Sequence, residues 1–383
     1  MSSQVIPSSH SSETAGSRST VSSTASSSSS RPGLRSHNLA VHLRQLYRFQ
    51  TFLREHEEPW RDRYAFLLSK GYQLRARYEP DWSPSWLTVD IDPAYCDDVI
   101  NSVLHMVLDA ERLVDGTTVC IKRINPETVT DEVKIAKYLS SAEMLCDSKN
   151  HCVPIWDSFR DPTIPKVEYI IMPPLRPFDD PEFGAVGEVV DFVTQMIEGM
   201  VFMHRHLVAH GDLTTPNIMM DARPILPTGW HFVAQHRTPD GVTPISPLAR
   251  IDHPVRYIII DFDCAVRLSE DQPHLITDFG GRDGDPRNIK DFYQKYEGLD
   301  FLASLIDFMK TADFRQRPDA EMALQYWLSI RAHVDIGKAR WRLQKRKETI
   351  GERVLYDTVA FAKEGVHRVK HMLTGGERRV YWS

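Results

Sequence analysis

The chain has 383 residues, of which 42% are apolar and 26% are charged. This composition is typical of a globular protein with a sizeable core, and the length allows one large domain or two to three ordinary ones. No run of eighteen uncharged apolar residues occurs, and no apolar segment follows the first methionine, so the sequence argues against secretion and against membrane spanning.

The charge is unevenly distributed. The whole chain carries only −6, which gives no general argument for nucleic-acid binding. Residues 331–383 hold 13 Lys and Arg against 6 Asp and Glu, so a tail of +7 follows a body of −13. Five cysteines without a C-x-x-C pair argue against a disulfide framework and a structural zinc site, and favour an intracellular location in the cytoplasm or nucleus.

The first two segments differ sharply in composition. Residues 1–36 form a Ser-rich stretch, with 15 Ser and 3 Thr among the first 35 residues, and we expect a disordered tail there. Residues 37–98 are predicted to be a helical and irregular extension: an amphipathic helix over 39–53, then an aromatic, proline-containing stretch over 72–93.

The next part favours a small antiparallel sheet. Two apolar or β-branched runs, at 103–110 and 117–124, flank Asp115-Gly116, which is a hairpin turn signal. A helix is expected over 132–139, and further strands are expected over 151–159 and 167–172.

Helices dominate the remainder. A long buried helix is expected over 186–207, and a proline-rich inserted excursion over 225–254 separates two strand-like pieces. After residue 289 the chain is mainly helical, with apolar helical runs at 301–309 and 317–324. The sequence therefore predicts an α+β fold in which a small sheet precedes the helices.

One polar constellation could support phosphoryl transfer. The segment His-Gly-Asp-Leu-Thr-Thr-Pro-Asn places Asp212 and Asn217 in a D-x-x-x-x-N spacing directly after the long helix. On one tight loop, the carboxylate could accept a hydroxyl proton while the amide oxygen holds a metal ion. Asp261, at the end of the apolar run 257–260, could supply a second metal ligand.

A lysine and a glutamate upstream could complete this constellation. Lys122 lies in the strand-like Val-Cys-Ile-Lys, and Glu132 begins the helix ten residues later. Paired together, they could hold the α and β phosphates of a nucleotide. Taken singly, these are an ordinary strand-end lysine and helix-start carboxylate, and Asp212 could cap a turn; it is their joint order that favours function.

With these motifs the chain resembles the protein kinase superfamily, and more closely a group of fungal kinase-like proteins. The resemblance covers about residues 100–330 and includes Pro-Pro-Leu-Arg-Pro-Phe-Asp-Asp at 173–180 and Asn-Ile-Met-Met-Asp after the loop. It implies a bilobal kinase fold, with an N-lobe over 99–172 and a C-lobe over 173–330. It also implies ATP and Mg²⁺, with Asp212 as catalytic base, Lys122 and Glu132 at the nucleotide, and Asn217 and Asp261 at the metal.

The chain departs from the kinase pattern at four positions. Between residues 80 and 122 the one glycine is Gly116, so no phosphate-covering glycine loop is recognisable. Gly211 replaces the arginine before the catalytic aspartate, Thr214 replaces a lysine, and Asp263 replaces the glycine of Asp-Phe-Gly. A literal Asp-Phe-Gly at 278–280 follows a poor strand and is interpreted as part of the activation segment.

One segment of the kinase pattern is also not recognisable. Only 56 residues separate Asp261 from Arg317, and this interval has no A-P-E and no D-x-x-x-x-G, so the kinase helix F is not recognisable. Either another segment replaces it, with the helix 39–53 and the C-terminal helix as candidates, or the chain is truncated internally, as by a missing exon.

The basic tail, residues 331–383, contains one apolar helical stripe with spacings of 4, 3, 4, 3 and 4, formed by Leu355, Val359, Ala362, Val366, Val369 and Leu373. Lys363, His367, Arg368 and Lys370 lie largely off the stripe. We expect a helix docked on the body with a solvated basic face. The alternatives are contact with an acidic membrane surface or partner, or phosphate contacts through the basic residues at 340–347.

The sequence leads to two functional hypotheses, and each involves another protein, either as a substrate or as a binding partner. The first is an ATP-dependent Ser/Thr-type protein kinase. The second is a pseudokinase, an interaction module with weak or no nucleotide turnover, which the altered positions favour. A third reading is an incomplete gene product without a stable fold.

Overall fold

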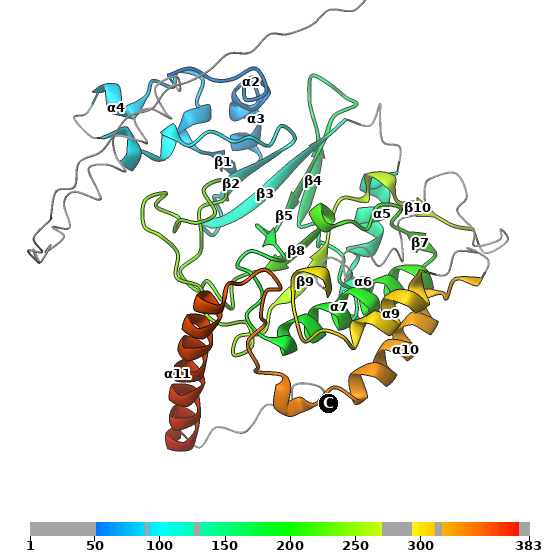
Figure 1. The fold of residues 1–383 in the computed structure, drawn as a ribbon. Helices are drawn as coiled ribbons and strands as arrows, with labels where there is room; N and C mark the ends of the chain where they lie inside the picture. Colours follow the sequence, from blue (N-terminus) through cyan, green and yellow to red (C-terminus); the bar gives the residue numbers. More distant parts are fainter. Residues whose placement is uncertain (1–50, 89–91, 126–130, 270–292, 311–315, 375–383) are drawn as a thin grey trace, which may run out of the picture.

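The computed structural model describes residues 51–88, 92–125, 131–269, 293–310 and 316–374 (Figure 1). The Ser-rich tail predicted over 1–36, most of the helix predicted over 39–53 and the Asp-Phe-Gly at 278–280 lie outside the described residues. The fold is α+β: Figure 1 shows a curled sheet at one end and the helices α7, α9 and α10 at the other.

The sheet contains five antiparallel strands in the order β1-β2-β3-β5-β4. Its centre is the predicted hairpin of β2 (Val107–Arg112) and β3 (Thr117–Ile124), in which Ala110 pairs with Val119. The other strands are β1 (Tyr72–Leu74), β4 (Asp157–Arg160) and β5 (Glu168–Met172). The sequence prediction left β1 in an irregular segment; its three residues are an edge strand because β2 offers them a free edge.

Short helices precede the sheet and lie between its strands in the sequence. The predicted helix over 132–139 is α5 (Glu132–Leu139), and α6 (Ala142–Leu145) follows it. Before and within the β1 to β2 connection lie α2 (Glu58–Arg61), α3 (Tyr64–Ser69), η1 (Ala76–Tyr78), α4 (Ser85–Thr88), η2 (Pro93–Tyr95) and η3 (Asp97–Val99).

The long helix predicted over 186–207 is α7 (Val186–Arg205). A loop and two small sheets surround its C-terminal end: β6 (Arg176–Pro177), β8 (Ile218–Asp221) and β9 (Arg256–Ile259) form one, and β7 (Val208–Ala209) pairs with β10 (Val266–Arg267) in the other. The turns η4 (Thr215–Asn217) and η5 (Phe262–Cys264) precede β8 and β10. As predicted, an excursion between β8 and β9 contains residues 225–254.

The last described elements are α9 (Leu302–Met309), α10 (Ala320–Ala332), η7 (Ile336–Lys338) and α11 (Ile350–Thr374). Within the described residues, no helix is long and apolar enough to cross a membrane.

Two clusters of buried side chains form the core. The smaller one lies between α2, α3 and one face of the sheet, where it includes Val119 and Ile121 of β3. The larger one includes Cys120 and Ile124 of the same strand and continues through α5, α7, β8, β9, α9 and α10. Because side chains of a strand alternate between faces, β3 contributes to both clusters.

Because the sequence contains no recognisable kinase helix F, other elements have to support α7. Trp327 of α10 is fully buried against α7 and donates from Nε1 to Thr194 Oγ1 at 2.9 Å. On another side, Gly187 N donates to Ala339 O at 2.8 Å. Thus, in the described part of the chain, α10 and the segment near residue 339 support α7. The helix α11 is one of the two proposed substitutes for helix F. Its side-chain hydrogen bonds go instead to residues 342–344 and 297.

Candidate active site

The alternation of β3 positions Lys122. It shares a strand face with Cys120 and Ile124, so its side chain points toward the larger core cluster and α5. The Lys122 side chain is 17% exposed, which places its ammonium at the edge of the core.

Two carboxylates bind this ammonium. Lys122 Nζ lies 2.5 Å from Glu132 Oε1 at the start of α5, as the sequence predicted, and it also contacts Asp261 Oδ1. Burial disfavours the charge of Lys122, but the two carboxylates outweigh it and raise the pKa of the ammonium. Burial also raises the pKa of Glu132, against the effect of Lys122, and Asp261 and Asp263 add to the rise. The site therefore has more negative than positive charge.

Asp261 follows β9 in an unusual conformation. Its φ of 69° and ψ of 75° lie in the left-handed region, where aspartate is one of the few tolerated non-glycine residues. This turn ends the strand and starts η5, which leaves the Asp261 side chain 34% exposed beside Lys122. Left-handed residues of this kind concentrate at functional sites, because surrounding structure must hold them.

The residues next to Asp261 tie it to the loop after α7. His210 is buried and its Nε2 lies 3.0 Å from Ile260 O, while its ring lies tilted against that of the buried Phe262, with 5.2 Å between the ring centres. The pairing of β7 with β10 flanks the same contact. The loop with Asp212 is therefore fixed to the turn that carries Asp261.

Asp212 and Asn217 are brought together within that loop. Asn217 Nδ2 donates to Asp212 O at 2.8 Å and to Asp212 Oδ2 at 3.2 Å, and Thr214 N donates to Asp212 O at 2.8 Å. The backbone of Asn217 accepts from Ile260 N at 3.0 Å, which joins the loop to β9. These bonds fix the shape of the loop and hold the side chains of Asp212 and Asn217 against each other.

Cys264 reports how close the acidic groups are. Burial and a hydrogen bond to Asp263 raise the pKa of its thiol to about 11, and the charges of Asp212 and Asp261 contribute to the rise. The charges of Asp212, Asp261 and Asp263 therefore all act on this thiol. The five residues predicted for the site lie on two linked groups: Lys122, Glu132 and Asp261, and Asp212 with Asn217.

The oxygen donors of Asn217 and Asp261 are of the kind that could bind Mg²⁺ together with phosphate. In the part of the chain that the structure describes, no three His, Cys, Asp or Glu side chains are grouped to hold a metal by themselves. Mg²⁺, however, is usually bound by one or two protein oxygens together with phosphate oxygens and water. Because Asn217 Nδ2 donates to Asp212, the acceptor Oδ1 is the amide atom that could face a cation beside Asp261.

A long connection joins β1 to β2, directly before the hairpin that carries Lys122. It contains no glycine between Leu74 and Val107. Its Arg75 guanidinium lies 3.3 Å from Asp109 and donates to Ile100 O at 2.8 Å, so this side chain is held within the connection. Asp97 of the connection accepts from His231 of the excursion at 2.8 Å. In its described part, the connection is therefore held by side-chain bonds to β2 and to the excursion.

Sequence reasoning missed two structural participants. His210 was part of the motif but had no assigned role, although its spacing from Asp212 could have indicated a ring that orders the loop. The contact of Asp97 with His231 joins residues 134 positions apart, and no local pattern signals it.

Most of the basic residues at 340–347 are occupied by intramolecular contacts. Arg340 pairs with Asp252 at 2.8 Å, Arg342 pairs with Glu348 and Asp357, and Lys345 contacts Glu182. The pairs of Arg340 and Lys345 attach the segment to the body, and those of Arg342 hold it to the start of α11, which gives the cluster a structural explanation.

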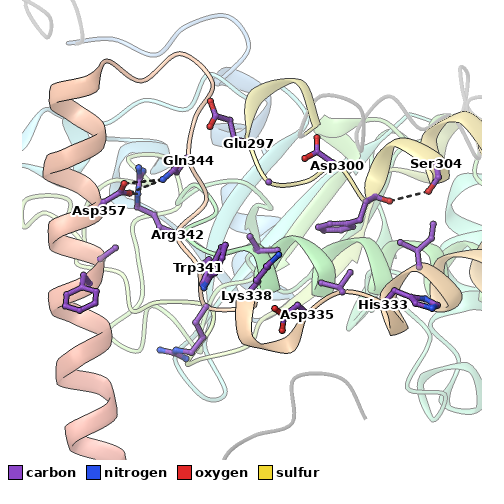
Figure 2. Close-up of a pocket in the computed structure, with 18 of the residues that line it drawn as sticks. Glu297, Asp300, Ser304, His333, Asp335, Lys338, Trp341, Arg342, Gln344 and Asp357 are labelled. Atoms are coloured by element: carbon purple, nitrogen blue, oxygen red, sulfur yellow. Dashed lines mark hydrogen bonds and ion pairs between the residues drawn. The ribbon is translucent and has the colours of Figure 1, made fainter.

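A groove of about 1180 Å³ lies apart from these residues (Figure 2). Its walls come from α10, the residues around 297–304, the segment 338–344 and α11. Neither Lys122 nor Asp212 lines it, so it is a separate feature of the surface.

No protein family model matches this chain, and no curated protein of similar sequence was found.

Proposed function

We propose that the chain is a kinase-like ATP-binding protein that transfers the γ-phosphoryl group of ATP to a Ser or Thr hydroxyl of a protein. In this proposal the sheet with α5 belongs to the N-lobe, over residues 99–172, and residues 173–330 are the C-lobe. The observation that carries it is the convergence of Lys122, Glu132 and Asp261 beside the bonded pair Asp212 and Asn217.

Each residue has a role that follows from its contacts. Lys122, held by the buried Glu132, would bind the α and β phosphates with an ammonium that stays charged. Asp212 would accept the proton of the attacking substrate hydroxyl. The hydroxyl oxygen would bond to the γ-phosphorus as ADP leaves. Mg²⁺, held by Asn217 and Asp261, would neutralise phosphate charge.

The contacts of Lys122 and the residues at two other positions of the site predict slow turnover. Lys122 already pairs with Asp261, so nucleotide phosphates and metal must compete with this ion pair. Thr214 offers no positive charge to the transferring group, and the β1 to β2 connection offers no glycine backbone. We therefore expect a rate well below that of a kinase with the full motif set.

The pseudokinase is the second candidate, and Asp263 favours it. This residue stands where the glycine of Asp-Phe-Gly is expected and adds a carboxylate that raises the pKa of Glu132. Excess negative charge opposes the binding of nucleotide phosphates unless a metal is bound as well. In this case the kinase-like body would act through partners.

The first test is thermal stabilisation, because a ligand that binds only the folded state raises the melting temperature. The purified chain is melted with ATP and Mg²⁺, with Mg²⁺ alone, and with ATP in EDTA. A shift that requires both ATP and Mg²⁺ is expected. A cooperative melt without any shift contradicts nucleotide binding.

The second test separates the two candidates. Asp212→Asn is compared with Asp81→Asn, a matched change at an exposed position in the β1 to β2 connection. Phosphotransfer to a protein substrate should fall at least 100-fold in the first variant and be unchanged in the second. A signal that persists in Asp212→Asn excludes catalysis by this site; ATP binding without transfer in the unsubstituted chain supports the pseudokinase.

A further inference from the structure

The helix α11 turns its polar side to the body. Arg353 pairs with Glu297 at 2.9 Å, and Asp357 accepts from Arg342 Nε at 2.6 Å and from Gln344 Nε2 at 3.2 Å. Figure 2 shows Arg342, Gln344 and Asp357 meeting between the helix and the neighbouring segment. In the first half of the helix, Arg353, Asp357 and Ala360 are half-buried, and the other side chains are exposed.

The apolar side of α11 faces outward instead. Val354 is 62% exposed, Leu355 is 60% exposed and Val359 is 43% exposed, and Ala362 is exposed as well. At 100° per residue these four positions fall within about 140° of the helix circumference, roughly opposite Arg353 and Asp357. The docked orientation expected from the sequence is thus wrong for the described part of the stripe: the helix is attached by its polar face.

The outward face continues beyond these residues. Ile350 is 85% exposed at the start of the helix, and Phe361 is 83% exposed at the rim of the groove. In the sequence the stripe extends to Val366, Val369 and Leu373, whose side chains lie outside those that the structure describes. The helix spans about 38 Å, and Figure 1 shows its C-terminal half extending away from the rest of the molecule.

Charge decides which surface this face fits. The tail 331–383 carries +7 against −13 for the rest of the chain. Arg340, Lys345 and Arg353 are paired with carboxylates of the body, so the remaining basic residues of the tail are the ones that attract a negative surface. Arg346 and Lys347 are exposed directly before the helix. By sequence register, Lys363, Arg368 and Lys370 fall at the two borders of the apolar arc, where long basic side chains reach headgroups from an in-plane helix.

A second copy of the chain fits less well. The stripe has heptad spacing, but the exposed arc is wider than the narrow a and d seam of a two-stranded coiled coil. A dimer through this face would also bring two tails of +7 together.

We propose that the outward face of α11 binds the surface of an anionic lipid bilayer, with the helix lying in the plane of the headgroups. The apolar residues Val354, Leu355 and Val359 enter the interface, and the basic residues at its borders contact the headgroups. The polar attachment to Glu297 and Arg342 holds the helix in this orientation before it meets a membrane. The proposal is independent of phosphoryl transfer.

The test is co-sedimentation of the full chain with vesicles. Vesicles of phosphatidylcholine with 30% phosphatidylserine should bind the chain, and vesicles of phosphatidylcholine alone should bind it at least tenfold more weakly. Leu355→Glu with Val359→Glu should lower binding to the anionic vesicles at least tenfold. The control is Leu113→Glu with Val114→Glu, which makes the same two changes at exposed positions of the β2 to β3 hairpin and adds the same charge.

Each outcome decides the proposal. Loss of binding in the α11 variant and its retention in the hairpin variant support it, provided that both variants melt like the original chain. Failure of the unsubstituted chain to bind anionic vesicles, or equal loss in both variants, overturns it. Light scattering identifies the alternative: a dimer that the α11 variant converts to a monomer, without vesicle binding, assigns the face to a second copy.

Discussion

The backbone of Gly211 lies directly against the carbonyl of Cys264. A Cβ atom at Gly211 would stand 2.4 Å from that oxygen, and the φ of Gly211 is +79°. Both facts require glycine here, whereas the kinase pattern has an arginine at this position. Gly211 is therefore required by the contact between the loop of Asp212 and the turn of Asp261.

Substitution of Gly211 should be costly for this reason. Gly211→Ala combines left-handed strain with a clash against backbone, and we expect a loss of about 3 kcal/mol in the free energy of unfolding. Gly298→Ala is the matched control, because its φ is +78° but no atom lies within 4 Å of the added Cβ. It should cost about 1 kcal/mol. Equal losses in urea unfolding would contradict the close approach to Cys264.

The sequence could predict those parts of the fold whose signals are local. Asp115-Gly116 fixes the hairpin that carries Lys122, and the helix that begins at Glu132 has the predicted bounds. Ten residues separate the two partners, so a strand followed by a helix brings them together almost unavoidably. The contact of Lys122 with Asp261, by contrast, joins residues 139 positions apart and depends on how β9 ends.

The orientation of α11 could not be predicted in the same way. Periodicity identifies an apolar face, but it does not identify what that face contacts. The expectation of docking failed because Glu297 and Arg342 on the body offer charges that match Arg353 and Asp357 on the other side of the helix. Likewise β1 was missed, since three residues are too few for a pattern and the strand exists through pairing with β2.

The buried ring of His151 should make stability depend on pH. Burial lowers the pKa of His151 to about 4, although its Nδ1 is hydrogen-bonded to Tyr257 O at 2.9 Å. Below the unfolded pKa near 6.5 the unfolded chain binds a proton that the folded chain rejects, so stability falls as the pH falls from about 6.5 toward 4. We expect this group to remove about 3 kcal/mol between pH 7 and pH 4.

His151→Gln isolates this contribution. The comparison has to be made between variant and original chain, because burial raises the pKa of Asp191 to about 6 and this carboxyl acts in the opposite direction over the same range. The advantage of the variant in urea unfolding should grow by about 3 kcal/mol from pH 7 to pH 4. A constant difference across this range would show that His151 does not titrate as a buried neutral ring.

The bond between Asp97 and His231 should hold the β1 to β2 connection to the excursion. His231 Nδ1 accepts from Val233 N and Ala234 N, so the ring proton is on Nε2 and donates to Asp97. Asp97→Ala removes this acceptor, and Asp97→Asn keeps one. Because the Asp97 side chain is 42% exposed, we expect a cost of about 1 kcal/mol in the first variant and little in the second.

Hydrogen exchange measures this effect locally. Amides of residues 225–254 should exchange several-fold faster in Asp97→Ala than in the original chain, and Asp97→Asn should resemble the original. If both variants exchange alike, the bond does not restrain the excursion.

The ion pair of Lys122 with Glu132 allows stability and ligand binding to be separated. Glu132 is 4% exposed, so Lys122→Met leaves a buried carboxylate without its cation and should cost about 3 kcal/mol. Lys122→Met with Glu132→Leu removes both charges and should recover most of this loss, since well-packed apolar residues replace buried ion pairs at little cost. The exposed pair of Lys137 with Glu168, 2.7 Å apart, is the control: Lys137→Met should cost less than about 1 kcal/mol.

Both Lys122 variants should lose the thermal shift by ATP with Mg²⁺, although only one of them is destabilised. An ATP shift that survives in the stable double variant would mean that the nucleotide binds without this lysine, and the proposed site would have to be moved.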